Sequence, residues 1–277
     1  MIRKTFFFLL FFLTFFATAE HLEIHFVDVG QGDGIVLRTD SAVVVVDSGM
    51  GVTMTRYLEN LGVEHIHLAV ATHAHADHIG GFPSLFQTFS VGTIWYNGQT
   101  HTTLTFERFL DAILSSSAVY HEPSRGETVQ FNDLTITVLH PEGSAAGYTG
   151  HLHDKNIVLR IEFGQFSALL TGDAEEYAEK SILESQIPIG STVLKLGHHG
   201  SRTSTSKEFL QAVSPQMAIY QAGERNSYGH PHREVLSLLS DLDIRTWGTD
   251  TYGTLVLVTN GDSFRLMTNT STTRENQ

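Results

Sequence analysis

Side chains that can bind a metal ion crowd one short stretch of the chain. Four of them fall within six consecutive positions: His73, His75, Asp77 and His78. The apolar segment before them, His67 to Ala71, is typical of a buried strand. In an extended backbone, residues i and i+2 share a face, so the imidazoles of His73 and His75 can reach one ion. Asp77 and His78 point differently and can serve a second ion. Imidazole and carboxylate ligands suit Zn²⁺ and also Mn²⁺ or Fe²⁺, so the stretch predicts a metal centre rather than a histidine-rich surface loop.

Further candidate ligands follow other apolar segments. Asp173 ends one such segment, the pair His198 and His199 ends another, and His230 belongs to a third cluster. By itself, Asp173 could cap a helix that starts at Ala174. Beside the histidine motif, a bridge between two ions is the better interpretation. Cysteine is absent, which excludes thiolate ligands, disulfides and a cysteine nucleophile.

The elements that must position these side chains follow from hydrophobic periodicity and turn residues. Strands are predicted at 22–29, 35–38, 42–47, 66–71, 92–96, 127–131, 134–139, 156–163, 166–170, 193–196, 217–221, 253–259 and 262–267, and helices at 54–61, 82–89, 105–114, 174–184, 206–213 and 232–239. Strands alternate with helices but hairpins occur too, which predicts two mixed sheets with helices outside. We expect one domain over 20–267.

Two loops needed a separate interpretation. The segment 29–34 (Val-Gly-Gln-Gly-Asp-Gly) has the glycines of a phosphate-binding loop. It has no lysine, and strand-forming residues follow it instead of a helix, so a tight hairpin turn is the better interpretation. The segment 141–155 is rich in glycine, serine and histidine and has no periodicity. We expect it to be a loop near the metal site.

The first 19 residues have the pattern of a cleavable signal peptide. Arg3 and Lys4 are basic, residues 5–16 are apolar, and Ala17 to Ala19 fits the small-x-small cleavage pattern. An uncleaved membrane anchor is the alternative, but the apolar run is shorter than the roughly 20 residues of a full span. We therefore expect cleavage after Ala19, a secreted or periplasmic chain without a membrane span, and a disordered tail at 268–277.

The chain is acidic, with a formal net charge of −13 that becomes −15 when Arg3 and Lys4 are removed. A surface this negative works against tight, nonspecific binding of nucleic acid through phosphate contacts. A phosphate ester held by metal ions remains compatible, since bound cations reverse the local field. The oligomeric state has no indication in the sequence.

Taken together, these motifs resemble a known family. The motif His73-x-His75-x-Asp77-His78 is similar to that of the metallo-β-lactamase fold superfamily. Other matching segments narrow the resemblance to the hydrolase domain of ComEC-type competence proteins and their stand-alone relatives, and secreted phosphorylcholine esterases are similar. In chain order these segments are Asp28 to Asp33, Val46 to Gly49, Asn156, Leu170 to Asp173 and Leu196 to Ser201. The match covers about residues 22–267.

The resemblance implies an α/β (α+β) fold, a four-layer αββα sandwich, with a two-metal site at the edge of its sheets. It also implies the ligands. The first ion would be held by His73 and His75, the second by Asp77 and His78, and Asp173 would bridge the two.

Some ligand positions stay open in this comparison. One of His198 and His199 would be a ligand; His199 is the preferred one, which leaves His198 to contact the substrate. Many members place a third histidine on the first ion, for which His151 and His153 are the candidates here. The subgroup often lacks that ligand and has asparagine at the position of Asn156, so the first ion can have three protein ligands only or bind more weakly.

The resemblance further suggests roles around the ions. Asp47 resembles the carboxylate that orients a ligand histidine. Two divalent ions, by preference Zn²⁺, would lie about 3.5–4 Å apart and share a hydroxide that attacks the substrate. Asp77, Asp173 and His198 are the expected catalytic residues. Candidates to hold the leaving group or phosphate oxygens are Lys195, Ser201 and His230, and candidates for the mouth of the site are Tyr228 and Arg225. For His230, fixing the start of the following helix is the alternative.

Three functions remain open at this level. The first, which the resemblance favours, is an exported dinuclear-metal hydrolase that cleaves a phosphodiester, either nucleic acid or a small phosphoester. The second is a hydrolase of a small carboxylic ester, lactone or β-lactam on the same metals. The third is a metal-dependent binding module without turnover, which the complete set of ligands disfavours.

Overall fold

Two β-sheets face each other in the computed structural model, which describes residues 20–268. The eight-stranded sheet has the order β15-β14-β1-β2-β3-β4-β5-β6, and the seven-stranded sheet has the order β13-β12-β11-β10-β9-β8-β7. The strands are β1 (Leu22–Phe26), β2 (Ile35–Arg38), β3 (Val43–Val46), β4 (His65–Ala71), β5 (Ser90–Tyr96), β6 (Val119–His121), β7 (Thr128–Phe131), β8 (Leu134–His140), β9 (Val158–Phe163), β10 (Phe166–Leu170), β11 (Val193–Lys195), β12 (Met217–Tyr220), β13 (Arg245–Gly248), β14 (Leu255–Thr259) and β15 (Phe264–Thr268).

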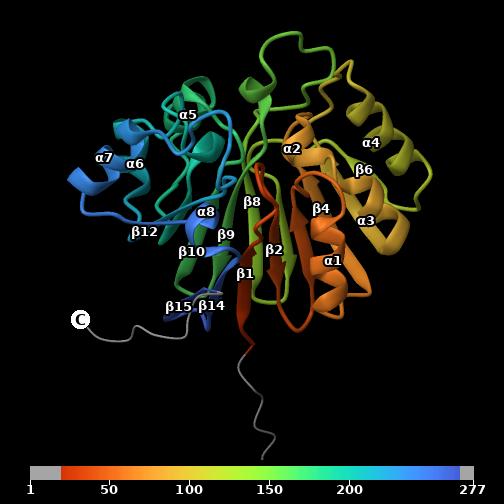
Figure 1. Ribbon diagram of the computed structural model, residues 1–277, viewed down its shortest axis with the longest axis horizontal. Helices are drawn as coiled ribbons and strands as arrows, with labels where there is room; N and C mark the ends of the chain where they lie inside the picture. The colour runs from red at the N-terminus through yellow and green to blue at the C-terminus, as the bar shows by residue number, and fades with distance from the viewer. Residues whose placement is uncertain (1–19, 269–277) are drawn as a thin grey trace, which may run out of the picture.

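Helices cover the outer faces of both sheets (Figure 1). They are α1 (Thr53–Asn60), α2 (Ala76–Ile79), α3 (Phe82–Thr88), α4 (Leu104–Leu114), α5 (Glu176–Glu184), α6 (Lys207–Val213), α7 (Arg233–Asp241) and α8 (Thr249–Tyr252). In Figure 1, α1, α3 and α4 flank one side of the molecule, and α5, α6 and α7 flank the other. The predicted αββα sandwich is confirmed. Within residues 20–268, no helix is both long and apolar enough to cross a membrane.

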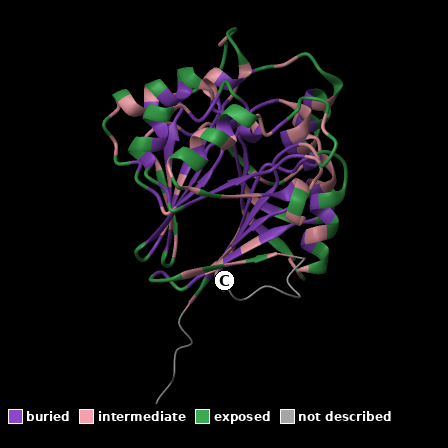
Figure 2. Cartoon of the chain, turned by 60° about the vertical axis from the view of Figure 1, so that its left-hand side comes forward, coloured by how far each residue is buried: buried purple, intermediate pink, exposed green. Residues whose placement is uncertain are grey.

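The layers are held together by three apolar cores. The central core joins the inner faces of the two sheets, with Ile24 and Leu37 from one sheet and Ile161 and Ile219 from the other. Each sheet also has one core between its outer face and its helices. Phe109 of α4 is fully buried in the first of these cores and Phe209 of α6 in the second. Figure 2 shows the strands buried and the outward helix faces exposed. This burial follows from the alternation and the 3.6-residue periodicity of the apolar residues.

Parallel pairing brings the important strand ends to one edge. β3 and β4 are parallel neighbours in the first sheet, and β10 and β11 are parallel neighbours in the second. The carboxyl ends of parallel strands lie at the same edge of a sheet. His78 of the first sheet's loops lies 3.2 Å from Asp173 of the second sheet's loops, so the two edges share one end of the sandwich. These loops carry Asp47, the 73–78 motif, Asp173 and the His198–His199 pair.

Some predicted boundaries change. The helix expected from Ala174 begins at Glu176, and Glu175 is its N-cap, so the interpretation of Asp173 as a helix cap is wrong. β6 and β13 were not predicted, because both are short edge strands with few buried apolar residues. Thr268 ends β15, so the predicted tail begins at least one residue later. The proposed signal peptide, 1–19, and the rest of that tail, 269–277, lie outside the described residues.

Candidate metal centre

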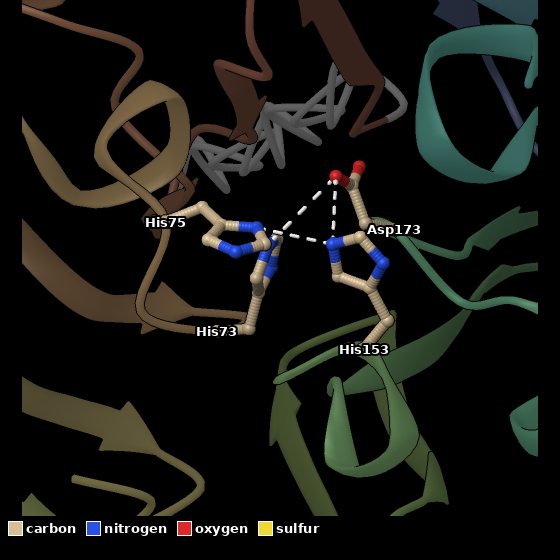
Figure 3. Close-up of side chains that lie close together, drawn as sticks. All are labelled: His73, His75, His153 and Asp173. Carbon is tan, nitrogen blue, oxygen red and sulfur yellow. Dashed lines mark hydrogen bonds and ion pairs between the residues drawn. The ribbon is translucent and has the colours of Figure 1, made fainter. Parts of the chain in front are cut away.

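The first cluster of ligand atoms lies just beyond β4. His73 Nε2 and His75 Nδ1 are 2.9 Å apart, and His153 Nε2 lies 3.0 Å from the same His75 nitrogen. Asp173 Oδ2 lies 3.7 Å from His73 Nε2. Figure 3 shows these four side chains converging. Ligand atoms about 2.0–2.1 Å from a tetrahedral Zn²⁺ stand roughly 3.3 Å from one another, so the four donors are spaced for one ion.

His153, and not His151, supplies the third imidazole of this cluster. His153 lies in a 3-10 turn, Leu152–Lys155, and is buried with its Nε2 3.6 Å from Asp173 Oδ2. His151 is exposed and lies outside the group of four. Of the alternatives left open for the first site, the geometry favours four protein donors over three, with His153 as the added histidine. Asn156 does not replace the histidine: it is buried, and its Oδ1 accepts a hydrogen bond from the backbone N–H of Asp173 at 3.0 Å.

The second cluster comprises Asp77 and His78, both in α2, and His199 from the 3-10 turn Gly197–Gly200 after β11. His199 Nε2 lies 3.4 Å from Asp77 Oδ2. His198 and His199 have left-handed φ values of 45° and 57°, a conformation that costs about 1–3 kcal/mol and is typical of functional turns. It directs the two rings differently: His199 is buried in the cluster, and His198 is outside it and lines the cleft. His199 stays the proposed ligand and His198 the proposed substrate contact.

Asp173 faces both clusters. Its Oδ2 points to the first, and its Oδ1 lies 3.2 Å from His78 Nε2 and 3.5 Å from His199 Nε2. One carboxylate with an oxygen toward each cluster has the geometry of a bridging ligand. Gly172 makes the turn that presents it, with φ +50°, and a Cβ there would lie 2.5 Å from Asn156 Oδ1. This position therefore requires glycine.

Buried hydrogen-bond acceptors fix the rings of two candidate ligands through the Nδ1 atom of each ring. His78 Nδ1 donates to Asp47 Oδ2 at 2.7 Å, and His199 Nδ1 donates to the backbone carbonyl of Gln221 at 2.9 Å. Asp47 is itself fixed, because the backbone N–H and the hydroxyl of Thr72 both donate to its carboxylate at 2.8 Å. Such partners set the tautomer and orientation of a ligand imidazole. The position of Asp47 suits the orienting role that we predict for it.

Burial and charge shift the pKa values in ways that favour a bound cation. Burial lowers the pKa of His73 well below its ordinary value and that of His75 to about 4, so both rings are neutral at neutral pH and can donate to a metal. Burial also opposes protonation of His78, but the carboxylates of Asp173 and Asp47 outweigh it and raise the His78 pKa well above its usual value. Carboxylates that favour a proton at this point also favour a metal ion.

Buried atoms without partners test whether the residues fit two metal ions. Within the described part of the chain, His78 Nε2, His199 Nε2 and Asp173 Oδ1 are buried and have no hydrogen-bond partner. An unsatisfied buried polar group costs about 1–3 kcal/mol, and these three atoms lie close enough to share one cation. The four-donor cluster lies beside them. Together, the imidazole and carboxylate ligands of the two clusters fit two divalent ions such as Zn²⁺, Mn²⁺ or Fe²⁺.

The burial of two predicted substrate contacts shows that they were wrong. Lys195 is fully buried, with its Nζ 2.6 Å from Asp33 Oδ2. Ser201 is also buried, and its hydroxyl pairs with that of Thr203 at 2.9 Å. Neither side chain lines the cleft. Both lie next to the His198–His199 turn in sequence, but their side chains turn into the protein.

Both clusters open into a cleft of about 620 Å³. The predicted substrate contact His230 lines the cleft, as does Tyr228, which was predicted at its mouth; Arg225, also predicted there, does not. The N-cap of α7 is His232, so the alternative role of His230 in starting that helix is not needed. Three further residues line it: Gln31, which lies in the matching segment Asp28 to Asp33 but was given no role, and His101 and Thr103, which had no signal in the sequence.

Glu175 is a functional candidate that the sequence interpretation missed. Its Oε1 lies 2.9 Å from His198 Nδ1 and 3.2 Å from His153 Nδ1. Burial opposes ionisation of Glu175, but contacts with His153, His198 and Thr203 outweigh it and lower its pKa. One carboxylate thus holds both a ligand of the first cluster and the candidate substrate contact. Its only signal in the sequence was its place two residues after Asp173.

Asp33 is the second missed residue. The 29–34 segment is the predicted hairpin turn between antiparallel β1 and β2, but it also reaches the site. The Asp33 backbone N–H donates to the carbonyl of Asp77 at 3.2 Å, and its Oδ1 lies 3.2 Å from His199 Nδ1. Gly32 permits this approach, since a Cβ there would lie 2.1 Å from the same Asp77 carbonyl oxygen.

Comparisons with known proteins agree with this geometry. A family model described as the metallo-beta-lactamase superfamily matches residues 27–223. ComE operon protein 3 of Bacillus subtilis (strain 168) is 31% identical over 254 residues, which cover 84% of this chain and 32% of that protein. Competence protein ComA of Neisseria gonorrhoeae is 30% identical over 237 residues, which cover 82% of this chain and 31% of that protein. The chain thus spans about a third of the length of these two relatives.

A solved structure shares the fold at low sequence identity. CmlA, a diiron beta-hydroxylase from Streptomyces venezuelae, has a TM-score of 0.56 at 16% identity, covering 81% of this chain and 52% of its own. At this identity the likeness shows the fold alone.

Proposed function

The chain belongs to the metallo-beta-lactamase superfamily, whose members are mostly metal-dependent hydrolases, and its competence-protein relatives confirm the predicted resemblance. From this premise we propose that it is an exported two-metal phosphodiesterase. The observation that carries the proposal is Asp173, whose two carboxylate oxygens face two separate groups of ligand atoms. Paired ions suit displacement at phosphorus, because they can stabilise both the attacking and the leaving oxygen.

The chain's own residues would bind and orient the ester. When bound, two divalent ions supply a hydroxide nucleophile near neutral pH and Lewis-acid stabilisation of the phosphoryl oxygens. His198 lines the cleft, its Nδ1 donates to Glu175 Oε1 at 2.9 Å, and its other nitrogen lies 3.7 Å from Asp173 Oδ2. There it can hydrogen-bond a phosphoryl oxygen or the leaving oxygen. In the overall reaction water adds to phosphorus, one ester P–O bond breaks, and the leaving alcohol takes a proton from the water.

Three further parts of the proposal rest on the sequence. Residues 1–19 have the signal-peptide pattern, which supports export to a secreted or periplasmic location. Zn²⁺ is the proposed metal, because imidazole ligands predominate in the two clusters. The net negative charge supports a small phosphoester over a long nucleic acid held nonspecifically.

A substrate panel combined with metal analysis tests the function. Purified protein loaded with Zn²⁺ or Mn²⁺ should hydrolyse bis-p-nitrophenyl phosphate and bind two ions per chain. Asp173→Ala should lose this activity and at least one ion, whereas Asp111→Ala, an exposed aspartate of α4, should retain both.

Each other outcome points to a different function. Cleavage of a lactone or nitrocefin without any phosphodiester would establish the small-ester alternative. Two bound ions without turnover on the panel would establish a binding module. Full activity of Asp173→Ala would contradict the two-metal mechanism itself.

A further inference from the structure

The outer part of the cleft carries an exposed aromatic ring and mostly polar side chains. Beyond the metal clusters and the neighbouring Glu175 and His198, its lining includes Gln31, His101, Thr103, His151, Tyr228 and His230. None of the described residues that line the cleft is lysine or arginine. A second phosphate or a long anionic tail would therefore find no lysine or arginine there and would face the Glu175 carboxylate. The lining suits a substrate with one phosphate at the metals and an uncharged group beside it.

Tyr228 and His230 form a stacked pair at this outer position. Their ring planes are 20° apart and their centroids 5.7 Å apart. Tyr228 is 64% exposed, whereas His230 is 8% exposed. Because Tyr228 lies on the wall of the cleft, its exposed ring offers a flat, polarised face to whatever enters it.

The loop that carries this pair is held in place. The Asn226 side chain accepts from the backbone N–H of His230 at 2.9 Å and donates to its carbonyl at 2.6 Å. The backbone N–H of His232 donates to the carbonyl of Gly200, directly after the His198–His199 pair, at 3.0 Å. An aromatic pair on a loop fixed in this way loses little conformational freedom when a ligand binds.

The Tyr228–His230 pair lies next to the proposed reaction centre. The His230 ring centroid is 5.2 Å from that of His198 and 6.0 Å from that of His199. His230 Nδ1 is also buried without a hydrogen-bond partner in the described part of the chain. A flat ring that carries polar edge atoms could therefore stack here while its phosphate reaches the metal ligands.

We propose that Tyr228 and His230 form a stacking subsite for a flat heteroaromatic ring, such as a nucleobase, on a substrate with a single phosphodiester. The proposal rests on the proposed phosphodiesterase function and names its substrate class. Stacking of one base on an aromatic side chain is worth about 1–3 kcal/mol, which corresponds to roughly a 5- to 150-fold change in affinity.

Three chromogenic diesters with the same leaving group test the subsite. They are the p-nitrophenyl esters of thymidine 5′-phosphate, methyl phosphate and phosphocholine. The thymidine ester should have the lowest KM. Tyr228→Leu should raise that KM roughly 5- to 150-fold with little change in kcat, and should leave the methyl ester unaffected. Tyr228→Phe should behave as the wild type, because it keeps the ring. Tyr177→Leu, a half-exposed tyrosine of α5 that does not line the cleft, is the matched control.

Direct binding separates this proposal from the proposed function. Calorimetry with thymidine 5′-monophosphate should show tighter binding than with methyl phosphate, and Tyr228→Leu should remove the difference. If no ester is hydrolysed but this difference is found, the phosphodiesterase function fails and the stacking subsite stands. Equal binding of the two phosphates, an equal loss for both esters in Tyr228→Leu, or a preference for the phosphocholine ester would each overturn the stacking subsite.

Discussion

The buried pair of Lys195 and Asp33 allows a sharp test of the corrected role of Lys195. Their side chains are 0% and 1% exposed, and Nζ lies 2.6 Å from Oδ2. Removing one partner of such a pair leaves a buried charge uncompensated and costs about 3–5 kcal/mol. We therefore expect Lys195→Met to lower the free energy of unfolding by about 3–5 kcal/mol. Asp33→Asn should also be strongly destabilising.

The double variant gives the decisive comparison. With both charges removed, neither member of the pair is left unpaired, and His199, which also contacts Asp33, keeps the Asp173 carboxylate 3.5 Å away. Replacing a buried pair by neutral groups is often nearly neutral. The double variant should therefore lose less stability than the sum of the single variants, by about 2 kcal/mol or more, within the range measured for contacting residues. Urea unfolding followed by circular dichroism measures these values. A chelator must be present, because bound metal would add its own stabilisation.

An exposed pair supplies the control. Lys180 and Glu184 lie 3.9 Å apart on α5 with exposed side chains, and pairs of this kind contribute less than about 1 kcal/mol. Lys180→Met should therefore leave unfolding nearly unchanged. The argument is refuted if Lys195→Met costs less than about 1 kcal/mol, or if the two single losses add. A variant of normal stability with a raised substrate KM would instead restore Lys195 as a substrate contact.

Three shorter predictions concern the supports of the site. Asp47→Asn should weaken metal binding roughly 10- to 100-fold, because His78 loses its orienting carboxylate; competition with a chromophoric chelator measures this, and unchanged affinity would contradict it. Gly32→Ala should reduce metal occupancy by displacing the Asp77 carbonyl, while Gly143→Ala, which has open space around its Cβ, should not. His140 is buried, and burial lowers its pKa to about 4. Its contribution to the free energy of unfolding is therefore complete above about pH 6.5. That contribution is lost as the pH falls toward 4, because the unfolded chain takes up the proton first. The loss is at most about 3 kcal/mol, and His140→Asn should flatten the dependence of the unfolding free energy on pH in that window; an unchanged slope would argue against the assignment.

Local patterns were sufficient for much of the fold. Alternating and continuous apolar segments marked the long strands, such as β4 and β8, because a buried face requires apolar side chains at regular spacing. The same patterns missed β6 and β13, whose edge positions bury little. A helix start was predicted two residues early at Ala174, since the cap is Glu175.

The types of the candidate metal ligands in the 73–78 motif, and their division between two clusters, could be predicted from the sequence alone. His73, His75, Asp77 and His78 are so close along the chain that strand and turn geometry already aims them in two directions. Distant ligands were a different matter. Only the tertiary structure decided that His153 joins the first cluster, that His199 joins the second, and that Lys195 forms a buried ion pair with Asp33. These choices depend on which side chains from separate strands and loops meet after both sheets have packed, and no local spacing encodes that meeting.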